Sequence, residues 1–354
     1  MTTGLLATLP EAGRRPLRPA RPGVELASQP MLATLSDRRE FSGDWIFERK
    51  LDGIRALAVR EGDRVGLYSR SGNRINATYP EIVDALAAQD CEDFTIDGEI
   101  VAFWHGRTDF SRLQQRMGLT RRRDVEASPV AVTYYVFDLL RLDGADTGQL
   151  PLRLRKSLLR RALTYRTPLR MTTHRNEGGA ELLATVCARG WEGLIAKRAG
   201  SRYQPRRSPD WLKLKCSRSQ EFVIGGFTAP AGSRVGFGAL LLGHYEDGPG
   251  GRLRYAGKVG TGFDHRTLME LHRRLEGMRR PTSPFVDRVR EPRPRWVEPE
   301  LVAQVAFTEW TRDGMLRHPR FLGLRDDKAA TEVVRERPSG GGGASPSLRT
   351  PGSS

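Results

Sequence analysis

The sequence of 354 residues is short of cysteine, and it has no long apolar run and no evident internal repeat. Its three cysteines, Cys91, Cys187 and Cys216, are too few and too scattered for a disulfide framework or a zinc site, and they fit a reducing compartment. Because no stretch approaches the ~20 consecutive apolar residues of a membrane span, we expect no membrane partner. These absences exclude a disulfide-stapled secreted domain and a zinc module, and they favour the cytoplasm.

Lysine is also scarce, although positive charge is not. The chain has 58 Lys and Arg against 42 Asp and Glu, a formal net charge of +16 at pH 7. Only seven of the 58 are lysines, at positions 50, 156, 197, 213, 215, 258 and 328. Arginine stays protonated and is a poor nucleophile, so each retained lysine is a candidate for chemistry that needs a compact ammonium. The net charge favours a polyanionic partner, nucleic acid before a membrane surface.

Composition divides the chain into four segments. Residues 1–28 carry four arginines among prolines and are expected to form a flexible basic arm. Residues 29–217 mix strand and helix patterns and form the expected first domain, whereas residues 218–336 are rich in short strands and form a second. Residues 337–354 are mostly Gly, Ser and Pro, so we expect a disordered tail.

The patterns predict an α+β fold with a largely antiparallel sheet in the first domain. Its expected strands are 45–51, 54–59, 65–69, 94–103, 130–140 and 193–197, and its expected helices are 80–88, 153–163 and one that Asn176 caps and that runs to Arg189. The second domain is expected to contain strands 222–228, 238–245, 253–259 and 302–311, and a helix that Asp264 caps and that runs to Met278. Short strands with one helix favour a small β-barrel of the five-stranded OB type.

Lys50 begins the run Lys-Leu-Asp-Gly-Ile-Arg, which contains the spacing K-x-D-G-x-R. We expect a lysine at a strand end, partly desolvated and surrounded by other cations, to have a lowered pKa and to attack phosphorus as the free amine. Gly53 would let the backbone approach a nucleotide, and Arg55 can pair with a phosphate through two parallel hydrogen bonds. The motif therefore predicts covalent phosphoryl chemistry at Lys50.

Four further lysines lie in compact clusters. Glu192 and Lys197 lie at the two ends of one expected strand, and residues 325–328 read Arg-Asp-Asp-Lys. Lys213 and Lys215 project from the same face of another strand, because side chains alternate with period two. Two like charges side by side repel, so an anion between them, such as a triphosphate, would resolve the conflict.

Carboxylates and one aromatic residue complete the candidate site. Glu99 or Glu192 together with phosphate oxygens would suit Mg²⁺, which takes few protein ligands. Phe137 could stack on a purine or be an ordinary core residue, and Asp138 is interpreted as a structural acid that pairs with an arginine. Lys156 lies on a helix among arginines, and we expect it to be solvated.

The ordered motifs resemble those of the covalent nucleotidyltransferases, the superfamily of DNA ligases, RNA ligases and mRNA capping enzymes. The details are most similar to the ATP-dependent ligase module of bacterial end-joining DNA ligases. The segments that carry this similarity are 30–33 (Pro-Met-Leu-Ala), 255–263 in the second domain and 320–325 near its end. The resemblance implies a nucleotidyltransferase (adenylation) domain over residues 29–217, followed by an OB-fold domain.

The resemblance also implies individual roles. Lys50 would take AMP from ATP and pass it to the 5′-phosphate of a nick, where the 3′-hydroxyl displaces it. Residues implied to bind ATP are Glu48 at the adenine edge, Phe137 on the ring, Glu99, Arg55 and Arg70 at ribose or phosphate, Lys197, and Arg325 and Lys328 at the pyrophosphate. Lys213 and Lys215 would contact the α-phosphate in catalysis, Glu192 and Glu99 would hold Mg²⁺ or Mn²⁺, and Arg70 and Lys258 would contact DNA.

Such an enzyme would act on nicked or broken duplex DNA as a monomer in the bacterial cytoplasm, close to the nucleoid. The expected partners are a Ku-like end-binding protein and a separate repair polymerase. Residues 216–221 are expected to act as a hinge that moves Lys328 towards ATP and away again.

Two alternatives stay open. A GTP-using mRNA capping guanylyltransferase shares the two-domain plan, although Ala329 and Ala330 follow Lys328 where capping enzymes tend to have Pro-Asn. A non-catalytic DNA-binding relative is the other, although such a protein in an Arg-rich chain could have used arginine in place of Lys50, Lys213 and Lys215.

Overall fold

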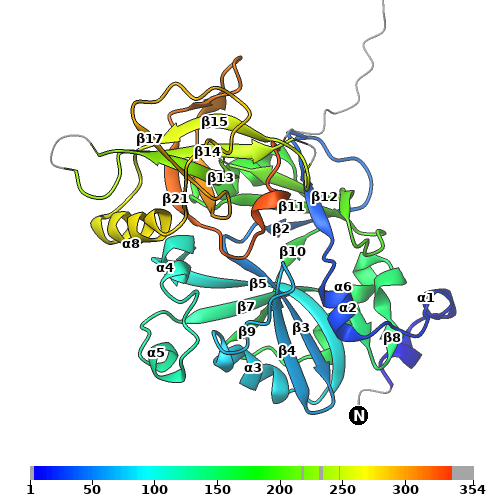
Figure 1. The fold of residues 1–354 in the computed structure, drawn as a ribbon. Coiled ribbons are helices and arrows are strands. Elements are labelled where there is room, and N and C mark those ends of the chain that lie inside the picture. Colours follow the sequence, from blue (N-terminus) through cyan, green and yellow to red (C-terminus); the bar gives the residue numbers. More distant parts are fainter. Residues whose placement is uncertain (1–3, 217–218, 231–233, 247, 337–354) are drawn as a thin grey trace, which may run out of the picture.

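The computed structural model describes residues 4–216, 219–230, 234–246 and 248–336 (Figure 1). The expected tail, residues 337–354, and two residues of the expected hinge lie outside the described residues. The described chain forms a seven-stranded and a five-stranded sheet in the first domain, a seven-stranded sheet in the second, and a two-stranded ribbon. Nearly all strand pairs are antiparallel. No helix in the described part of the chain has the length and apolar character needed to cross a membrane.

Residues 4–28 form short helices that pack on the first domain. These are η1 (Leu6–Thr8), α1 (Glu11–Arg14) and α2 (Gly23–Ala27). Leu9 and Ala27 are buried, and the Gly23 N–H donates to Glu61 Oε1 at 3.0 Å. The expectation of a flexible basic arm is therefore wrong for residues 4–28, because the apolar residues between the arginines and prolines join the core.

The seven-stranded sheet forms the base of the first domain. Its strands are β3 (Ile54–Glu61), β4 (Arg64–Ser69), β5 (Asp93–Trp104), β6 (Arg107–Thr108), β7 (Val132–Leu142), β8 (Ala145–Asp146) and β9 (Leu169–Met171). The pairing order is β4-β3-β5-β7-β8, with β6 beside β5 and β9 parallel to β7. The predicted hairpin of β3 and β4 is confirmed.

The five-stranded sheet carries most of the motif residues. Its strands are β1 (Leu32–Leu35), β2 (Trp45–Arg49), β10 (His174–Arg175), β11 (Gly193–Arg198) and β12 (Arg207–Lys215), in the order β1-β12-β11-β2-β10. Helix α7 (Ala180–Ala188) covers one face through Leu183 and Val186, which pack with Trp45, Phe47 and Leu214. The alternate residues of these strands are left to face the opposite side.

The remaining helices of the first domain are α3 (Pro80–Ala87), α4 (Phe110–Gln114), α5 (Arg122–Glu126), α6 (Leu152–Ala162) and the 3₁₀ turn η2 (Thr147–Gln149). The expected helices 80–88 and 153–163 correspond to α3 and α6. The expected cap Asn176 is wrong, because α7 follows Gly179, whose φ of 136° stops the helix from starting earlier. Asn176 Oδ1 instead accepts from Arg153 Nη1 at 3.0 Å.

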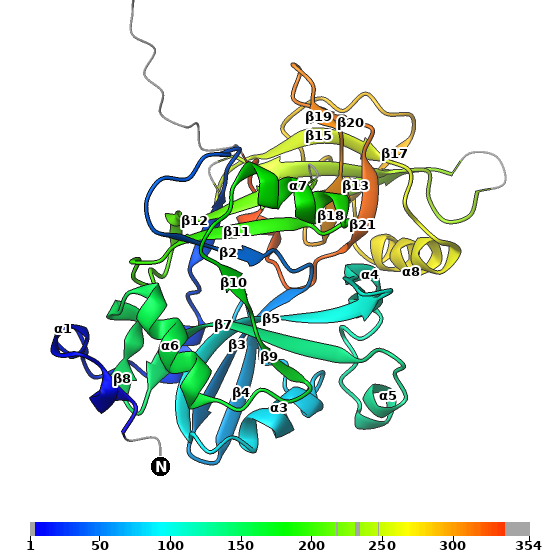
Figure 2. The ribbon, with the colours of Figure 1, turned by 180° about the vertical axis from the view of Figure 1, so that it is seen from behind.

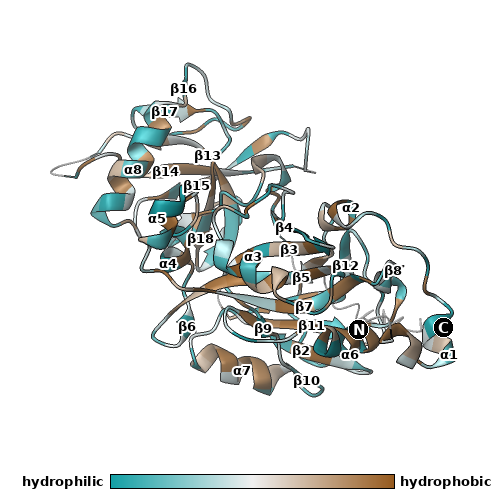
Figure 3. Cartoon of the chain, turned by 90° about the horizontal axis from the view of Figure 1, so that it is seen from below, coloured by the Kyte–Doolittle hydropathy of each residue, from teal (hydrophilic) through white to brown (hydrophobic). Residues whose placement is uncertain are grey.

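The second domain contains one large sheet and one amphipathic helix. Its elements are β13 (Ser219–Thr228), β14 (Leu240–Tyr245), β15 (Leu253–Val259), α8 (His265–Glu276), β16 (Arg279–Arg280), β17 (Pro294–Val297), β18 (Val302–Ala306), β19 (Glu309–Trp310), β20 (Leu316–Arg317), β21 (Arg320–Leu324) and η3 (Ala330–Glu332). The predicted cap is confirmed, since Asp264 Oδ1 accepts from the Thr267 N–H at 2.7 Å. Leu268, Leu271 and Leu275 bury one face of α8, which alternates between teal and brown along its turns in Figure 3.

The strands of the second domain pair in the order β15-β14-β13-β17-β16, and β18 joins β13 to β21. The expected strand 302–311 is split into β18 and β19. These pairings do not form a closed barrel within the described residues. In Figures 1 and 2, the five-stranded sheet lies between the sheet of β3, β4, β5 and β7 and the second domain.

Cys187 and Cys216 form a disulfide, with their Cα atoms 5.2 Å apart. The sequence argued against a disulfide framework, and the structure has this single bridge, which the expectation of reduced cysteines did not include. Cys187 lies near the end of α7 and Cys216 directly follows β12, and both pack against the same apolar cluster between helix and sheet. This packing joins residues that are separated by 29 positions in the chain, which their spacing did not indicate.

Candidate active site

A cavity of about 180 Å³ lies where the two sheets of the first domain meet the second domain. Twelve of the thirteen predicted site residues line it. These are Glu48, Lys50, Arg55, Arg70, Glu99, Phe137, Glu192, Lys197, Lys213, Lys215, Arg325 and Lys328. The exception is Lys258, which lies outside the cavity in β15, is half-exposed and forms an ion pair with Glu291 at 2.7 Å.

The backbone holds Lys50 at the junction of the two sheets. Its N–H donates to Gly193 O at 2.9 Å, directly after β2 ends. A Cβ atom on Gly53 would lie 2.2 Å from Ile100 O, so only glycine lets the chain pass from β2 into β3 here. Gly53 does make a close backbone contact, but this contact is with the backbone of β5, whereas the predicted contact was with a nucleotide.

Carboxylates rather than cations surround the Lys50 ammonium. Nζ forms an ion pair with Glu192 Oε1, and both side chains are largely buried. Burial opposes the charged form, but Glu192, Asp52 and Glu99 outweigh it, so the pKa of Lys50 is raised above its usual value. The expectation of a lowered pKa is therefore wrong for this state of the protein, in which Lys50 is protonated.

The same carboxylates provide oxygen donors that fit a divalent cation. Burial, together with Glu192, raises the pKa of Asp52 to about 6, and burial raises that of Glu99 to about 7. Glu192 Oε2 is buried and has no hydrogen-bond partner among the described residues. No three His, Cys, Asp or Glu side chains of the described chain form a metal site by themselves. The donor set thus fits Mg²⁺, which binds through one or two carboxylates and completes its shell with phosphate oxygens and water.

Glu48 is buried between two lysines. Its Oε2 lies 2.7 Å from Lys197 Nζ, and its Oε1 forms an ion pair with Lys156 Nζ. The expectation that Lys156 is solvated is wrong, because this residue is 3% exposed and projects from the face of α6 that packs on the first domain. The burial of Lys156 is explained by its ion pair with Glu48, which is distant in sequence.

Aromatic rings and cations form the neighbouring wall. Lys197 Nζ lies 4.2 Å from the ring centroid of Phe137 and 4.0 Å from that of Trp211. Arg55 Cζ lies 4.6 Å from the Phe137 centroid. Phe137 is therefore both a core residue and part of the cavity wall. Sequence reasoning missed Trp211 as a site residue, although it directly precedes the two-lysine motif.

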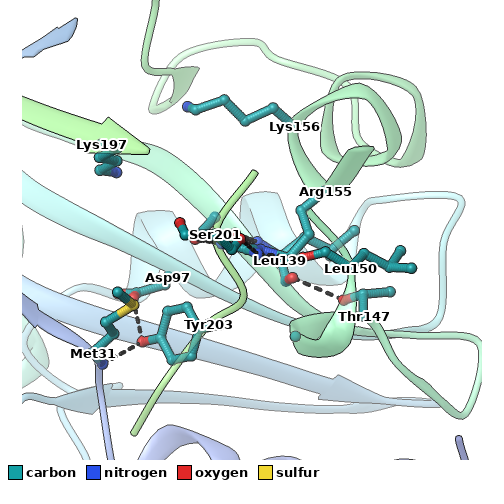
Figure 4. Close-up of polar contacts among 12 residues, drawn as sticks. Met31, Asp97, Leu139, Thr147, Leu150, Arg155, Lys156, Lys197, Ser201 and Tyr203 are labelled. Carbon is teal, nitrogen blue, oxygen red and sulfur yellow. Dashed lines mark hydrogen bonds and ion pairs between the residues drawn. The ribbon is translucent and has the colours of Figure 1, made fainter. Parts of the chain in front are cut away.

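Arg55 is held by a carboxylate of its own domain. Its Nε and Nη2 donate to the two oxygens of Asp97, each at 2.5 Å, and Nη2 also donates to Met31 O at 3.2 Å. Tyr203 donates to Asp97 at 2.7 Å and accepts from the Met31 N–H, as Figure 4 shows. The predicted two-bond pairing of Arg55 with phosphate is therefore replaced by pairing with Asp97, although Arg55 still lines the cavity.

The interpretation of Asp138 as a structural acid is confirmed. Both of its oxygens accept from Arg155, at 2.7 and 2.8 Å, and both side chains are fully buried. Burial opposes the carboxylate, but Arg155 outweighs it and lowers the pKa of Asp138. This pairing holds α6 beside β7, the strand that carries Phe137. Arg155 also donates to Leu150 O and Ser201 O (Figure 4).

Lys213 and Lys215 share an anion, as their placement on one strand face predicts. The anion is the carboxylate of Glu336, whose Oε1 forms an ion pair with Lys213 Nζ and whose Oε2 lies 3.7 Å from Lys215 Nζ. Burial lowers the pKa of Lys213 to about 8. Glu336 has a pKa of about 2, because the two lysines outweigh the effect of burial. The chain itself thus occupies the position expected for a phosphate.

The second domain closes the cavity. Lys328 Nζ donates to Glu221 Oε2 at 2.9 Å, and Arg325 forms two hydrogen bonds with Asp327. Arg70 of the first domain pairs with Glu332 at 3.2 Å. The Gln114 side chain in α4 adds a contact, because it donates to the backbone of β21 at 2.7 Å. The structure therefore brings the predicted 325–328 cluster to the same cavity as Lys50.

Two family models match the chain: residues 30–215 match the ATP-dependent DNA ligase domain and residues 233–328 match the ATP-dependent DNA ligase C-terminal region. The chain is 40% identical over 343 residues to the multifunctional non-homologous end joining protein LigD of Pseudomonas aeruginosa, and 40% identical over 320 residues to that of Mycobacterium bovis. The matches cover 93% and 87% of this chain but 40% of each relative. A solved structure of mycobacterial DNA ligase D complexed with ATP and MES is 37% identical, covers 87% of this chain and 98% of its own, and has a TM-score of 0.59.

The chain therefore spans less than half of the length of these two relatives. Both family models lie over the two domains that line the cavity, and the first covers the whole series of motifs from Lys50 to Lys215. On this evidence, the chain belongs to the ATP-dependent DNA ligase family.

Proposed function

We propose that this protein seals breaks between 3′-hydroxyl and 5′-phosphate ends of duplex DNA, with ATP as co-substrate and through lysyl-AMP and DNA-adenylate intermediates. The observation that carries the proposal is the meeting of Lys50 with the other predicted ATP-site residues around one cavity. The family match disfavours the capping-enzyme alternative, and the non-catalytic alternative is tested below.

In the first step, Lys50 Nζ would form a bond to the α-phosphorus of ATP while the bond to the β-phosphate oxygen breaks. Nζ must first lose a proton, and Glu192 Oε1 already contacts it and can accept that proton. Glu192 Oε2, with Glu99, would hold Mg²⁺ or Mn²⁺, and this ion would neutralise charge on the departing pyrophosphate. Lys213 and Lys215 would stabilise charge that develops on the α-phosphate oxygens.

The remaining wall residues would position the nucleotide. Glu48 would face the adenine edge and Phe137 the ring, while Glu99, Arg55 and Arg70 would lie near ribose or phosphate. Arg325 and Lys328 of the second domain would orient the pyrophosphate. Phosphoryl transfer needs little covalent help from the protein, so this positioning and the surrounding charge supply most of the acceleration.

The second domain would act as an OB-type module over residues 218–336 that follows an adenylation domain over residues 29–217. Its strand-rich sheet with a single helix supports this assignment. Arg70 and Lys258 would contact DNA, and residues 216–221 would let the second domain move between the ATP-bound and DNA-bound arrangements.

The biological setting would be bacterial end joining, as the names of the relatives suggest. A Ku-like end-binding protein and a separate repair polymerase would act with the protein, which would work as a monomer in the cytoplasm beside the nucleoid. A net charge of +16 supports a polyanionic partner and predicts DNA binding that weakens steeply with salt.

Labelled nucleotide tests the proposal directly. Incubation with α-labelled ATP should leave the label on the protein in a denaturing gel, and addition of nicked duplex should release it as AMP while the nick is sealed. Lys50→Ala should show no label, whereas Arg122→Ala, which removes an exposed cation on α5, should match the wild type. Label from GTP alone, or no label from either nucleotide, would contradict the proposal.

A further inference from the structure

Glu48 is a buried acid that contacts two bases from different elements. Lys197 reaches its Oε2 from β11 at 2.7 Å, and Lys156 reaches its Oε1 from α6. All three side chains are at most 3% exposed. Figure 4 shows the Lys156 side chain extending from α6 towards the strand that carries Lys197. Burial of two ammonium groups around one carboxylate costs free energy, because charges taken out of water must be well paired to offset their desolvation.

The two lysines approach Glu48 from different sides. Lys197 lines the nucleotide cavity and contacts the rings of Phe137 and Trp211. Lys156 is not among the described residues that line this cavity. It lines a separate groove with Arg160, Arg161 and other residues of α6. Lys156 thus contacts Glu48 from behind, away from the space that a nucleotide would occupy.

The protonation state of Glu48 determines which purine it can recognise. An ionised carboxylate only accepts hydrogen bonds, whereas a protonated carboxyl can also donate one. At position 6, adenine carries an amine that donates and guanine carries a carbonyl that accepts. Where Glu48 faces position 6, the ionised carboxylate therefore accepts from the adenine amine and repels the guanine carbonyl, whereas a protonated carboxyl could donate to that carbonyl.

Burial alone would favour the protonated carboxyl, and the lysines reverse this preference. Burial is the largest influence on Glu48, but Lys156 and then Lys197 outweigh it, so its pKa is lowered. Another titratable group nearby is His174, which is the register partner of Glu48 in the β10–β2 pair and is also influenced by the charges of Arg153 and Arg160. Burial and the adjacent Lys156 lower the pKa of His174, so it is neutral at pH 7 and cannot replace a lysine.

We propose that Lys156 is a positioning residue that determines nucleotide specificity: its ammonium keeps the Glu48 carboxylate ionised and oriented, so that the cavity selects ATP over GTP. The inference rests on the proposed function, because it requires the purine to bind next to Glu48. Lys156 lies outside the cavity that would hold the nucleotide, and it would act through Glu48.

The experiment compares kcat/KM for self-adenylation with ATP and self-guanylation with GTP in the full chain. Lys156→Met should reduce the ratio of ATP to GTP about tenfold, the scale of one hydrogen bond at position 6, because burial opposed by Lys197 alone then favours the protonated carboxyl of Glu48. The reduction should grow as the pH is lowered towards 6, because more Glu48 is then protonated. Lys156→Arg keeps the charge and should retain most of the ratio. Arg160→Met removes a charge from the same groove without contacting Glu48 and should leave the ratio unchanged.

A second variant keeps the inference testable if Lys156→Met does not fold. Glu48→Gln presents both a donor and an acceptor and should lower the ratio with Lys156 intact. In the Glu48→Gln background, Lys156→Met should have no further effect on the ratio. An unchanged ratio in folded Lys156→Met, or an equal drop in both backgrounds, would overturn the inference while leaving the ligase proposal intact. Failure of the wild type to form an AMP adduct would instead overturn the proposed function.

Discussion

Glu336 Oε1 forms an ion pair with Lys213 Nζ inside the cavity, at a position where the motif predicts a nucleotide phosphate. The carboxylate and a phosphate cannot occupy this position together. Because Lys213 and Lys215 together hold Glu336 at a pKa of about 2, the carboxylate is charged at every physiological pH. ATP that binds with its phosphate at Lys213 and Lys215, as proposed, would therefore displace it.

Glu336→Gln should lower the KM for ATP in self-adenylation about fivefold, which corresponds to about 1 kcal/mol of relieved competition. The measurement is the rate of AMP-adduct formation against ATP concentration. Glu309→Gln changes an exposed acid that pairs with Arg317 and serves as the control. An unchanged or raised KM in Glu336→Gln would show that the carboxylate does not compete with the nucleotide.

Lys50→Arg should be as inactive as Lys50→Ala, although it keeps the positive charge. Arginine cannot lose its proton at physiological pH, so it has no lone pair to attack phosphorus. We expect adenylation below detection for both variants and near-normal binding of nicked duplex in a gel-shift assay. Any covalent AMP on the Lys50→Arg protein would refute the assignment of the nucleophile.

The carboxyl of Glu99 makes stability depend on pH. Burial raises its pKa from 4.5 to about 7, so its contribution to stability is present in full below about pH 4.5 and is lost as the pH rises through 7. Glu99→Gln removes this titration. The free energy of unfolding of the variant, relative to wild type, should therefore increase by about 1–3 kcal/mol between about pH 5 and pH 8. Urea denaturation at several pH values measures this difference, and a difference that stays constant with pH would contradict the raised pKa.

The disulfide between Cys187 and Cys216 should stabilise the first domain. It closes a loop of 29 residues, for which cross-linking of the unfolded chain contributes about 3 kcal/mol. Dithiothreitol should lower the urea midpoint of the wild type to that of Cys187→Ser, and the variant itself should not respond to the reductant. A wild-type midpoint that is unaffected by reductant would show that the bridge does not form in solution.

Local patterns sufficed for much of the fold, whereas several residues that line the cavity, such as Glu48 and Arg70, were expected only from the resemblance to nucleotidyltransferases. The hairpin of β3 and β4, helices α3, α6 and α8, and the cap by Asp264 depend on residues close in sequence, and these predictions agree with the structure. Four of the motif lysines, at positions 50, 197, 213 and 215, lie in or directly after strands of the five-stranded sheet, and Lys328 follows β21; all five line one cavity.

The errors share a physical cause, which is contact between residues distant in sequence. Lys156 looked like one of several cations on a helix, but its partner Glu48 lies on β2. The high pKa of Lys50 comes from Glu192, which packing brings to it across the sheet. The disulfide and the ordered residues 4–28 likewise depend on tertiary contacts that periodicity does not encode.

Gly53 lies within the catalytic motif, yet its requirement comes from the neighbouring backbone, since any Cβ would meet Ile100 O. The position of Lys50 and that of the adjacent sheet therefore depend on the same close backbone contact. A mutational scan scored by cell survival would find Gly53 as intolerant as Lys50, but nucleotide binding measured with the pure protein would distinguish the two positions. Loss of Lys50 removes one reactive side chain, whereas loss of Gly53 displaces the backbone that positions this side chain.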